Sequence, residues 1–153
     1  MILTRMPKGV KFFNAVVCPI FFKNGTTVVL QKRYDHPIYP GLWGFPAGKV
    51  KPSDVSVEAA ILREIEEETG IIYDVSDLIG PTVVPARHQK LNKQYFYFTA
   101  YIYKINSEDG HRIKIDKKEH RNSLVIPWQN VLATSKKHLI PDAHETLFLL
   151  KQK

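Results

Sequence analysis

The sequence predicts an α/β or α+β sandwich, because strand-like segments alternate along the chain with a small number of helical ones. One long helical pattern begins near Ser56, and two shorter ones follow prolines near the C-terminus. With 153 residues, the chain is long enough to bury a substantial core, and it fits one domain that spans residues 1–153. Its 44% hydrophobic and 24% charged residues are ordinary for a globular protein.

The first strands are expected before the long helix. Segments 12–22 and 26–33 have the composition of strands, and the Lys-Asn-Gly sequence between them is typical of a hairpin turn. Segment 43–50 is predicted to be a short strand that leads into the loop before the helix. Ser56 is a good N-cap for that helix, and Gly70 is a suitable C-cap.

The second half of the chain continues this alternation. Segments 78–84 and 94–105 are predicted strands, and the second alternates polar or aromatic residues with apolar ones. A last strand is expected over 123–126. Pro127 at a first helical position predicts a short helix through residue 133, and Pro141 predicts another through residue 150.

The long helix carries four glutamates within five residues. At about 100° per residue, Glu64, Glu67 and Glu68 share one sector of the helix surface, whereas Glu66 points away. Like charges one turn apart destabilise a helix by about 0.2–0.5 kcal/mol per pair. The crowding becomes favourable if a divalent cation lies among these groups, because hard cations bind carboxylate oxygens. Arg63 lies one turn before Glu67, where it can pair with that carboxylate and hold it.

The stretch from Gly48 to Ile71 resembles the signature of the Nudix hydrolases. From Arg63 to Ile71 it matches every specified position, which is Arg-Glu-hydrophobe-x-Glu-Glu-x-Gly-hydrophobe. Asp54 stands at the family's spacing from Gly48, where glutamate is usual, and one extra residue separates it from Arg63. The flanking segment 41–49 also resembles the family's entry strand and loop. A pattern with so many fixed positions is far more specific than a lone glycine motif.

The resemblance implies a mixed β-sheet sandwiched between α-helices and a metal-dependent hydrolase of diphosphate linkages in nucleotide derivatives. It implies that Glu64, Glu67 and Glu68 carry the metal ions, usually Mg²⁺ or Mn²⁺, and that the backbone carbonyl of Gly48 contributes. Arg63 would orient a glutamate rather than touch the substrate. Divalent ions offset the charge of a diphosphate and lower the pKa of bound water, so a carboxylate cluster suits this chemistry.

The general base and the phosphate contacts stay open in the sequence. Some family members use a glutamate of the helix as the base, and others use a glutamate of a later loop, where Glu119 lies in this chain. Glu119 is equally consistent with an exposed loop acid. Arg33, Lys49 and Arg87 are candidates for contacts with the substrate's phosphates, and each is equally consistent with a surface charge.

Aromatic residues before the entry strand are candidates for contact with a nucleobase. They are Tyr34, His36 and Tyr39, in a loop that varies among such enzymes. The histidines of the chain are otherwise expected on the surface or in loops rather than as metal ligands. They are His36, His88, His111, His120, His138 and His144.

A nucleoside triphosphate pyrophosphohydrolase is the preferred prediction. Little chain precedes the first strand, whereas relatives that cleave ADP-sugars often carry an extra N-terminal sheet. Pro85 lies about as far after the signature as a proline of ADP-ribose-cleaving relatives, so ADP-ribose or another nucleotide sugar is an alternative substrate. The net charge of +7 also suits a pyrophosphohydrolase of RNA 5′ ends. A non-catalytic binding module of this fold is a further alternative, although such proteins usually lose a helix glutamate.

Composition also bears on location and partners. The longest apolar stretch, 12–22, is interrupted by a polar residue and a proline and is too short to span a bilayer. The N-terminus shows no secretory signal, and Cys18 is the only cysteine, in an apolar stretch that predicts a buried and inert thiol. We therefore expect a cytoplasmic monomer or homodimer that binds a nucleotide or nucleotide derivative and no membrane.

Overall fold

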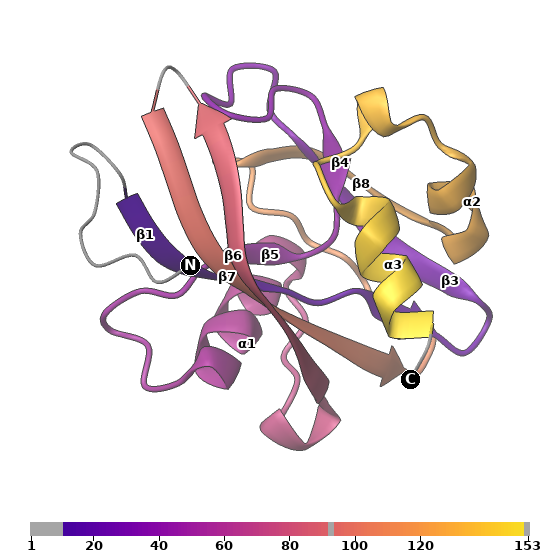
Figure 1. The fold of residues 1–153 in the computed structure, drawn as a ribbon. Coiled ribbons are helices and arrows are strands. Elements are labelled where there is room, and N and C mark those ends of the chain that lie inside the picture. The colour runs from indigo at the N-terminus through magenta and orange to yellow at the C-terminus, as the bar shows by residue number, and fades with distance from the viewer. Residues whose placement is uncertain (1–10, 92–93, 152–153) are drawn as a thin grey trace.

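The computed structural model describes residues 11–91 and 94–151. Its strands form one mixed sheet that twists through the centre of the molecule (Figure 1). The strands are β1 (Lys11–Val17), β2 (Ile20–Phe22), β3 (Thr26–Lys32), β4 (Trp43–Gly44), β5 (Ala47–Lys49), β6 (Ile79–Leu91), β7 (Gln94–Ser107) and β8 (His120–Pro127). The helices are α1 (Val57–Thr69), α2 (Trp128–Ala133) and α3 (Ala143–Lys151), with 3₁₀ turns η1 (Val75–Asp77) and η2 (Lys136–His138).

The long strand β7 takes part in both parallel and antiparallel pairs. It pairs in parallel with β1 and β2 and antiparallel with β6. Strand β3 pairs antiparallel with β2, β4 and β8, and β5 pairs antiparallel with β1. The predicted mixed sheet is therefore confirmed, and it brings β5 and the start of β8 towards α1.

Two apolar clusters lie on the two faces of this sheet. Val28 and Leu30 of β3 belong to the cluster beneath α1, whereas Val29 belongs to the cluster beneath α2 and α3. Because successive side chains of a strand point to opposite faces, these memberships place helices on both sides of the sheet. Figure 1 shows the same layering, with α1 beside β5 and with α2 and α3 beside β3 and β8. The predicted sandwich of sheet and helices is confirmed.

Proline accounts for two differences between the predicted and the observed strands. The predicted strand 12–22 is divided between β1 and β2, because Pro19 has no N–H to donate to a neighbouring strand. Cys18 donates its backbone N–H to the carbonyl of Pro46 at 2.9 Å. The predicted strand 43–50 is likewise divided around Pro46, since β4 pairs with β3 and β5 pairs with β1. The burial of Cys18 is confirmed, and it raises the pKa of the thiol.

The ends of α1 agree with the sequence. The hydroxyl of Ser56 accepts a hydrogen bond from the N–H of Ala59 at 3.0 Å. Gly70 has φ 77° and donates its N–H to the carbonyl of Glu66. The proline-led helices α2 and α3 are also confirmed, although α3 begins two residues after Pro141. The strand predicted at 123–126 begins earlier, at the polar residue His120, because β3 pairs with it throughout.

No helix in residues 11–91 and 94–151 is long and apolar enough to cross a membrane. The longest, α1, has 13 residues and carries acidic groups along one side.

Replacing Ile61 with alanine is expected to lower the free energy of unfolding by about 2–5 kcal/mol, because buried methyl groups are lost and a cavity remains. Ile61 is 0% exposed, between α1 and the sheet. The matched control is Ile72→Ala, since Ile72 is 77% exposed, and its effect should stay within about 0.5 kcal/mol. Urea unfolding measures both variants, and equal losses would contradict this core.

Candidate functional site

The acidic side of α1 contains two buried carboxyl groups and one exposed one. Glu64 is 7% exposed and Glu68 is 2% exposed. The side chain of Glu67 is 47% exposed, at the rim of the cluster, and Glu66 is exposed as expected. The helix spacing therefore directs Glu64 and Glu68 towards β5 and β8, with Glu67 beside them.

Gly48 makes room for one of these carboxyl groups. A Cβ atom at this position would lie 2.2 Å from the carboxyl carbon of Glu64, and 2.4 and 2.7 Å from its two oxygens. A side chain at position 48 would therefore have to displace the Glu64 carboxyl group. The absence of a side chain at Gly48 thus lets β5 run directly against the acidic side of α1.

The two buried carboxyl groups cannot easily both be charged. Burial raises the pKa of Glu64, although Arg63 opposes this effect. Burial, followed by the charge of Glu64, raises the pKa of Glu68 well above its ordinary value. Like charges in a low-dielectric site favour protonation of one group. A cation placed between them would remove the need for that proton.

The carboxylate oxygens of these glutamates are chemically suited to bind a hard divalent cation. Carboxylate oxygens are the ligands that Mg²⁺ and Mn²⁺ prefer, and the Glu64 carboxyl group lies directly against Gly48. Within the described residues, no three acidic, histidine or cysteine side chains are arranged to hold one ion as they stand. Glu67 contacts Arg63 instead, so its role as a metal ligand stays a prediction.

Arg63 is the centre of an ion-pair network. It donates to Glu64 Oε1 at 2.8 Å and to Glu67 Oε2 at 3.3 Å, so the predicted pairing with Glu67 is present. Its ion pair with Asp54 is bidentate: the two carboxylate oxygens of Asp54 accept hydrogen bonds from Nε at 2.8 Å and from Nη2 at 2.9 Å. Arg63 lowers the pKa of Asp54 to about 2. The extra residue in the loop therefore does not prevent Asp54 from reaching the arginine.

Glu119 is held by a buried lysine. Its Oε1 atom accepts a hydrogen bond from Lys32 Nζ, and His36 Nε2 lies 3.8 Å from the same oxygen. Burial raises the pKa of Glu119, but the hydrogen bond and charge of Lys32 outweigh burial and lower it. His36 Nδ1 accepts the N–H groups of Ile38 and Tyr39, so its hydrogen lies on Nε2 and faces Glu119. Glu119 is thus an ionised carboxylate in an ordered environment.

His120 was expected on the surface or in a loop, and that expectation was wrong. It is 1% exposed, and its Nε2 atom lies 3.6 Å from Glu68 Oε1. The reason is that β8 begins at His120, opposite Lys32 of β3, and directs the imidazole inward. Extending the predicted strand 123–126 by three residues towards the N-terminus would have placed His120 on a strand.

The other histidines differ in their surroundings. His111 and His138 are exposed as expected, whereas His36 is half-buried. His144 is also half-buried, and its Nε2 lies 2.9 Å from the carbonyl of Val131. The side chain of His88 lies outside the part of the chain whose side chains are described.

The four predicted substrate contacts do not gather at one point. Arg33 is exposed and pairs with Asp35 at 2.9 Å. Lys49 adjoins Gly48 in β5, and its backbone carbonyl accepts from Arg63. Tyr34 is 67% exposed. Arg87 lies in β6, in a stretch whose side chains the structure does not describe.

Arg121 lies over the ring of Tyr34, a contact that the sequence did not indicate. Its guanidinium carbon lies 4.1 Å from the centre of the tyrosine ring, and Nη1 donates to the Tyr34 hydroxyl at 3.0 Å. Gln31 Oε1 accepts from the same Nη1 at 3.1 Å. Arg121 lies on the Gln31 side of β8, whereas His120 lies opposite Lys32, so the stack and His120 are on opposite faces of the sheet. The polar sequence of this strand gave no signal for it.

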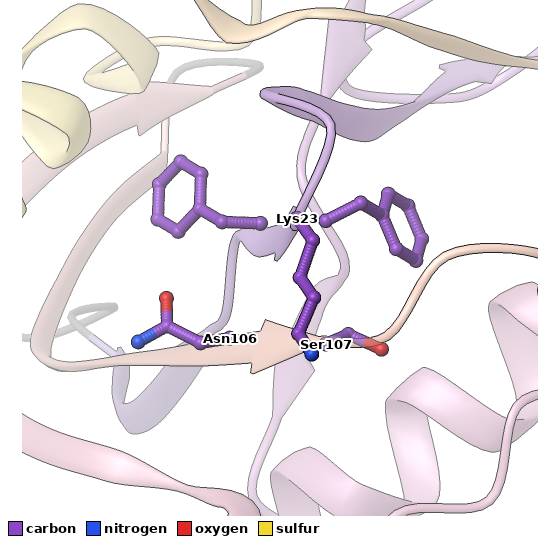
Figure 2. Close-up of a pocket in the computed structure, with 5 residues that line it drawn as sticks. Lys23, Asn106 and Ser107 are labelled. Atoms are coloured by element: carbon purple, nitrogen blue, oxygen red, sulfur yellow. The ribbon is translucent and has the colours of Figure 1, made fainter.

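Two surface hollows lie elsewhere. Figure 2 shows one of about 260 Å³ at the end of β7, where the side chain of Lys23 extends towards Ser107. A wider one, of about 500 Å³, is lined by Gly70, Arg112, Ile113 and Lys114. Neither of these two hollows is lined by the glutamates of α1.

Comparisons with known proteins agree with this architecture. The profile of the NUDIX domain matches residues 11–146. The nucleoside triphosphatase NudI of Enterobacter sp. (strain 638) is 36% identical over 57 residues, which are 37% of this chain and 40% of NudI. The uncharacterized Nudix hydrolase NudL of Yersinia pestis (strain Pestoides F) is 39% identical over 67 residues, or 43% of this chain and 34% of NudL. The chain thus spans well under half the length of these relatives.

Solved structures show the same fold over nearly the whole chain. The NUDIX domain of Shewanella oneidensis NrtR, crystallised with ADP ribose, superposes with a TM-score of 0.73 at 19% identity, covering 97% of this chain and 93% of that one. The MutT protein of Methanosarcina mazei Go1 gives 0.71 at 19% identity, covering 93% and 94%. At this identity the likeness concerns the fold.

Gly48→Ala is expected to weaken Mn²⁺ binding about tenfold or more, because the new Cβ would displace the Glu64 carboxylate. The control is Gly110→Ala, where nothing lies within 4 Å and only the φ of +86° opposes a side chain. That variant should bind Mn²⁺ as the original protein does. Electron paramagnetic resonance of free Mn²⁺ measures both, and unchanged binding by Gly48→Ala would contradict the proposed position of the ion.

Proposed function

We propose that this chain, which belongs to the Nudix hydrolase family, hydrolyses a diphosphate linkage in a nucleoside diphosphate derivative with Mg²⁺ or Mn²⁺. The observation that supports this proposal best is the buried pair of Glu64 and Glu68 against the gap at Gly48. Within this class we favour a nucleoside triphosphate, cleaved to a monophosphate and pyrophosphate. The name of the relative NudI, a nucleoside triphosphatase, supports that choice.

Glu64, Glu67 and Glu68 would hold the divalent ions, together with the carbonyl of Gly48. When bound, such ions offset the charge of the diphosphate and lower the pKa of coordinated water. Arg63 would act on the carboxylates rather than on the substrate, because its described hydrogen bonds go to Asp54, Glu64, Glu67 and the Lys49 carbonyl. It would fix two of the metal-binding side chains relative to the loop.

The proton of the attacking water has two candidate acceptors. Glu119 is ionised, but its ion pair with Lys32 lowers its pKa and weakens it as a base. Glu67 is half-exposed at the rim of the acidic cluster. We therefore favour a glutamate of α1 as the general base and give Glu119 a supporting electrostatic role.

A nucleobase would stack on the layer formed by Tyr34 and Arg121. Planar guanidinium groups and aromatic rings both stack on bases, and both residues are exposed. The network with Gln31 fixes the layer before substrate arrives. Lys49 and, farther from α1, Arg33 and Arg87 remain the proposed phosphate contacts.

The substrate class is tested by incubating the protein with a panel of phosphoanhydrides and identifying the phosphorus product by ³¹P NMR. The panel contains nucleoside triphosphates, ADP-ribose, dinucleoside polyphosphates, and capped and triphosphorylated RNA, each with Mg²⁺ and with Mn²⁺. Pyrophosphate and a nucleoside monophosphate are the expected products. Cleavage of ADP-ribose or RNA alone would overturn the choice of substrate, and no cleavage at all would overturn the enzymatic proposal.

Glu67→Gln is expected to reduce turnover by at least about a hundredfold, because it removes both a proposed ligand and the favoured proton acceptor. Glu66→Gln is the matched control, since Glu66 is adjacent, exposed and outside the cluster, and it should leave turnover unchanged. Glu119→Gln should fall between the two. Steady-state kinetics with confirmed folding by circular dichroism measures all three. Full activity in Glu67→Gln would refute the assignment of the acidic cluster.

Tyr34→Ala and Arg121→Ala are expected to raise KM for a nucleoside triphosphate about tenfold or more, because stacking of a base is lost. Turnover of ribose 5-triphosphate, which has no base, should stay unchanged in both. Arg112→Ala, an exposed arginine beside Gly70, is the control. An equal loss with both substrates would show that the layer does not contact the base.

A further inference from the structure

His120 and Glu68 form a buried contact that the proposed reaction does not explain. Their side chains are 2% and 3% exposed, and His120 Nε2 lies 3.6 Å from Glu68 Oε1. This separation is longer than an N–H···O hydrogen bond of about 2.7–3.2 Å. A movement of about half an ångström would close it.

The imidazole is placed to donate a hydrogen bond to the Glu68 carboxyl group. Its Nδ1 atom is buried and has no hydrogen-bond partner among the described residues. The Glu68 carboxyl group is an acceptor that faces Nε2, whereas Nδ1 faces no partner among the described residues. The hydrogen therefore belongs on Nε2, directed at Glu68.

Glu68 is approached from a second side by the main chain. The N–H of Ala47 points at its two oxygens, at 3.5 Å from Oε1 and 3.3 Å from Oε2. Ala47 belongs to β5, and His120 begins β8. Three elements, β5, α1 and β8, thus meet at one carboxyl group.

We propose that His120 is a positioning residue, which holds the Glu68 carboxylate in the orientation that binds a divalent cation. The inference rests on the proposed metal-binding role of Glu68. Outer hydrogen bonds of this kind fix the rotamer of a metal-binding carboxylate, and their loss commonly costs about 10–100-fold in metal affinity. His120 itself is not assigned as a ligand, because the described residues contain no three-ligand group.

Two substitutions of different chemistry distinguish a positioning role of His120 from a role in core packing alone. His120→Gln retains an N–H donor near the position of Nε2, whereas His120→Leu retains bulk and loses the donor. A packing role predicts that both variants behave alike, or that leucine is the better replacement in a buried site. A positioning role predicts rescue by glutamine.

The experiment measures Mn²⁺ affinity by electron paramagnetic resonance, without substrate, in variants shown to be folded by circular dichroism. His120→Leu is expected to weaken Mn²⁺ binding about 10–100-fold, and His120→Gln is expected to recover most of that loss. His144→Leu and His144→Gln are the controls, because His144 is half-buried and contacts only a backbone carbonyl among its described hydrogen bonds. Both should bind Mn²⁺ as the original protein does.

Two results would overturn the inference. If both His120 variants bind Mn²⁺ as tightly as the original protein, or both lose affinity equally, His120 does not orient Glu68, and the proposed function stands. If the original protein itself binds no Mn²⁺, the metal-binding proposal fails together with this inference. Substrate turnover is not needed to tell these results apart.

Discussion

The burial of two neighbouring carboxyl groups is the constraint on which the rest of this site depends. Glu64 and Glu68 are almost inaccessible to solvent, one turn apart on α1. An isolated buried charge costs far more than a surface one, so such groups are neutralised, paired or bound to metal. A protein that needed only a stable helix would place apolar residues there. A cation-binding role would explain why Glu64 and Glu68 are buried together.

The surrounding residues each offset part of that cost. Arg63 supplies one positive charge and is itself held by Asp54. Gly48 removes the side chain that would collide with Glu64. His120 places a hydrogen-bond donor beside Glu68. One arginine does not balance the acidic side chains around it, and in the proposed function the remaining negative charge would attract a divalent ion and, through it, a polyphosphate.

Features that depend on local sequence were predictable. The caps of α1 and the orientation of its glutamates follow from residue spacing, which is why Ser56 and Gly70 mark the ends of the helix. The interior position of His120 was not predictable in this way, because it depends on pairing between β8 and the distant strand β3. Arg121 was overlooked for the same reason, since its partner Tyr34 follows β3. Spacing alone also favoured Glu67 as the partner of Arg63, whereas the loop brings Asp54 closer.

The most direct test of the account is a crystal structure with Mn²⁺ and a non-hydrolysable nucleoside triphosphate analogue, using anomalous scattering to locate the metal. The account predicts an anomalous peak within coordination distance, about 2.0–2.4 Å, of carboxylate oxygens from Glu64 and Glu68, beside Gly48 and the phosphates. A structure with the analogue bound but no metal at these carboxylates, or with the metal held elsewhere, would contradict it.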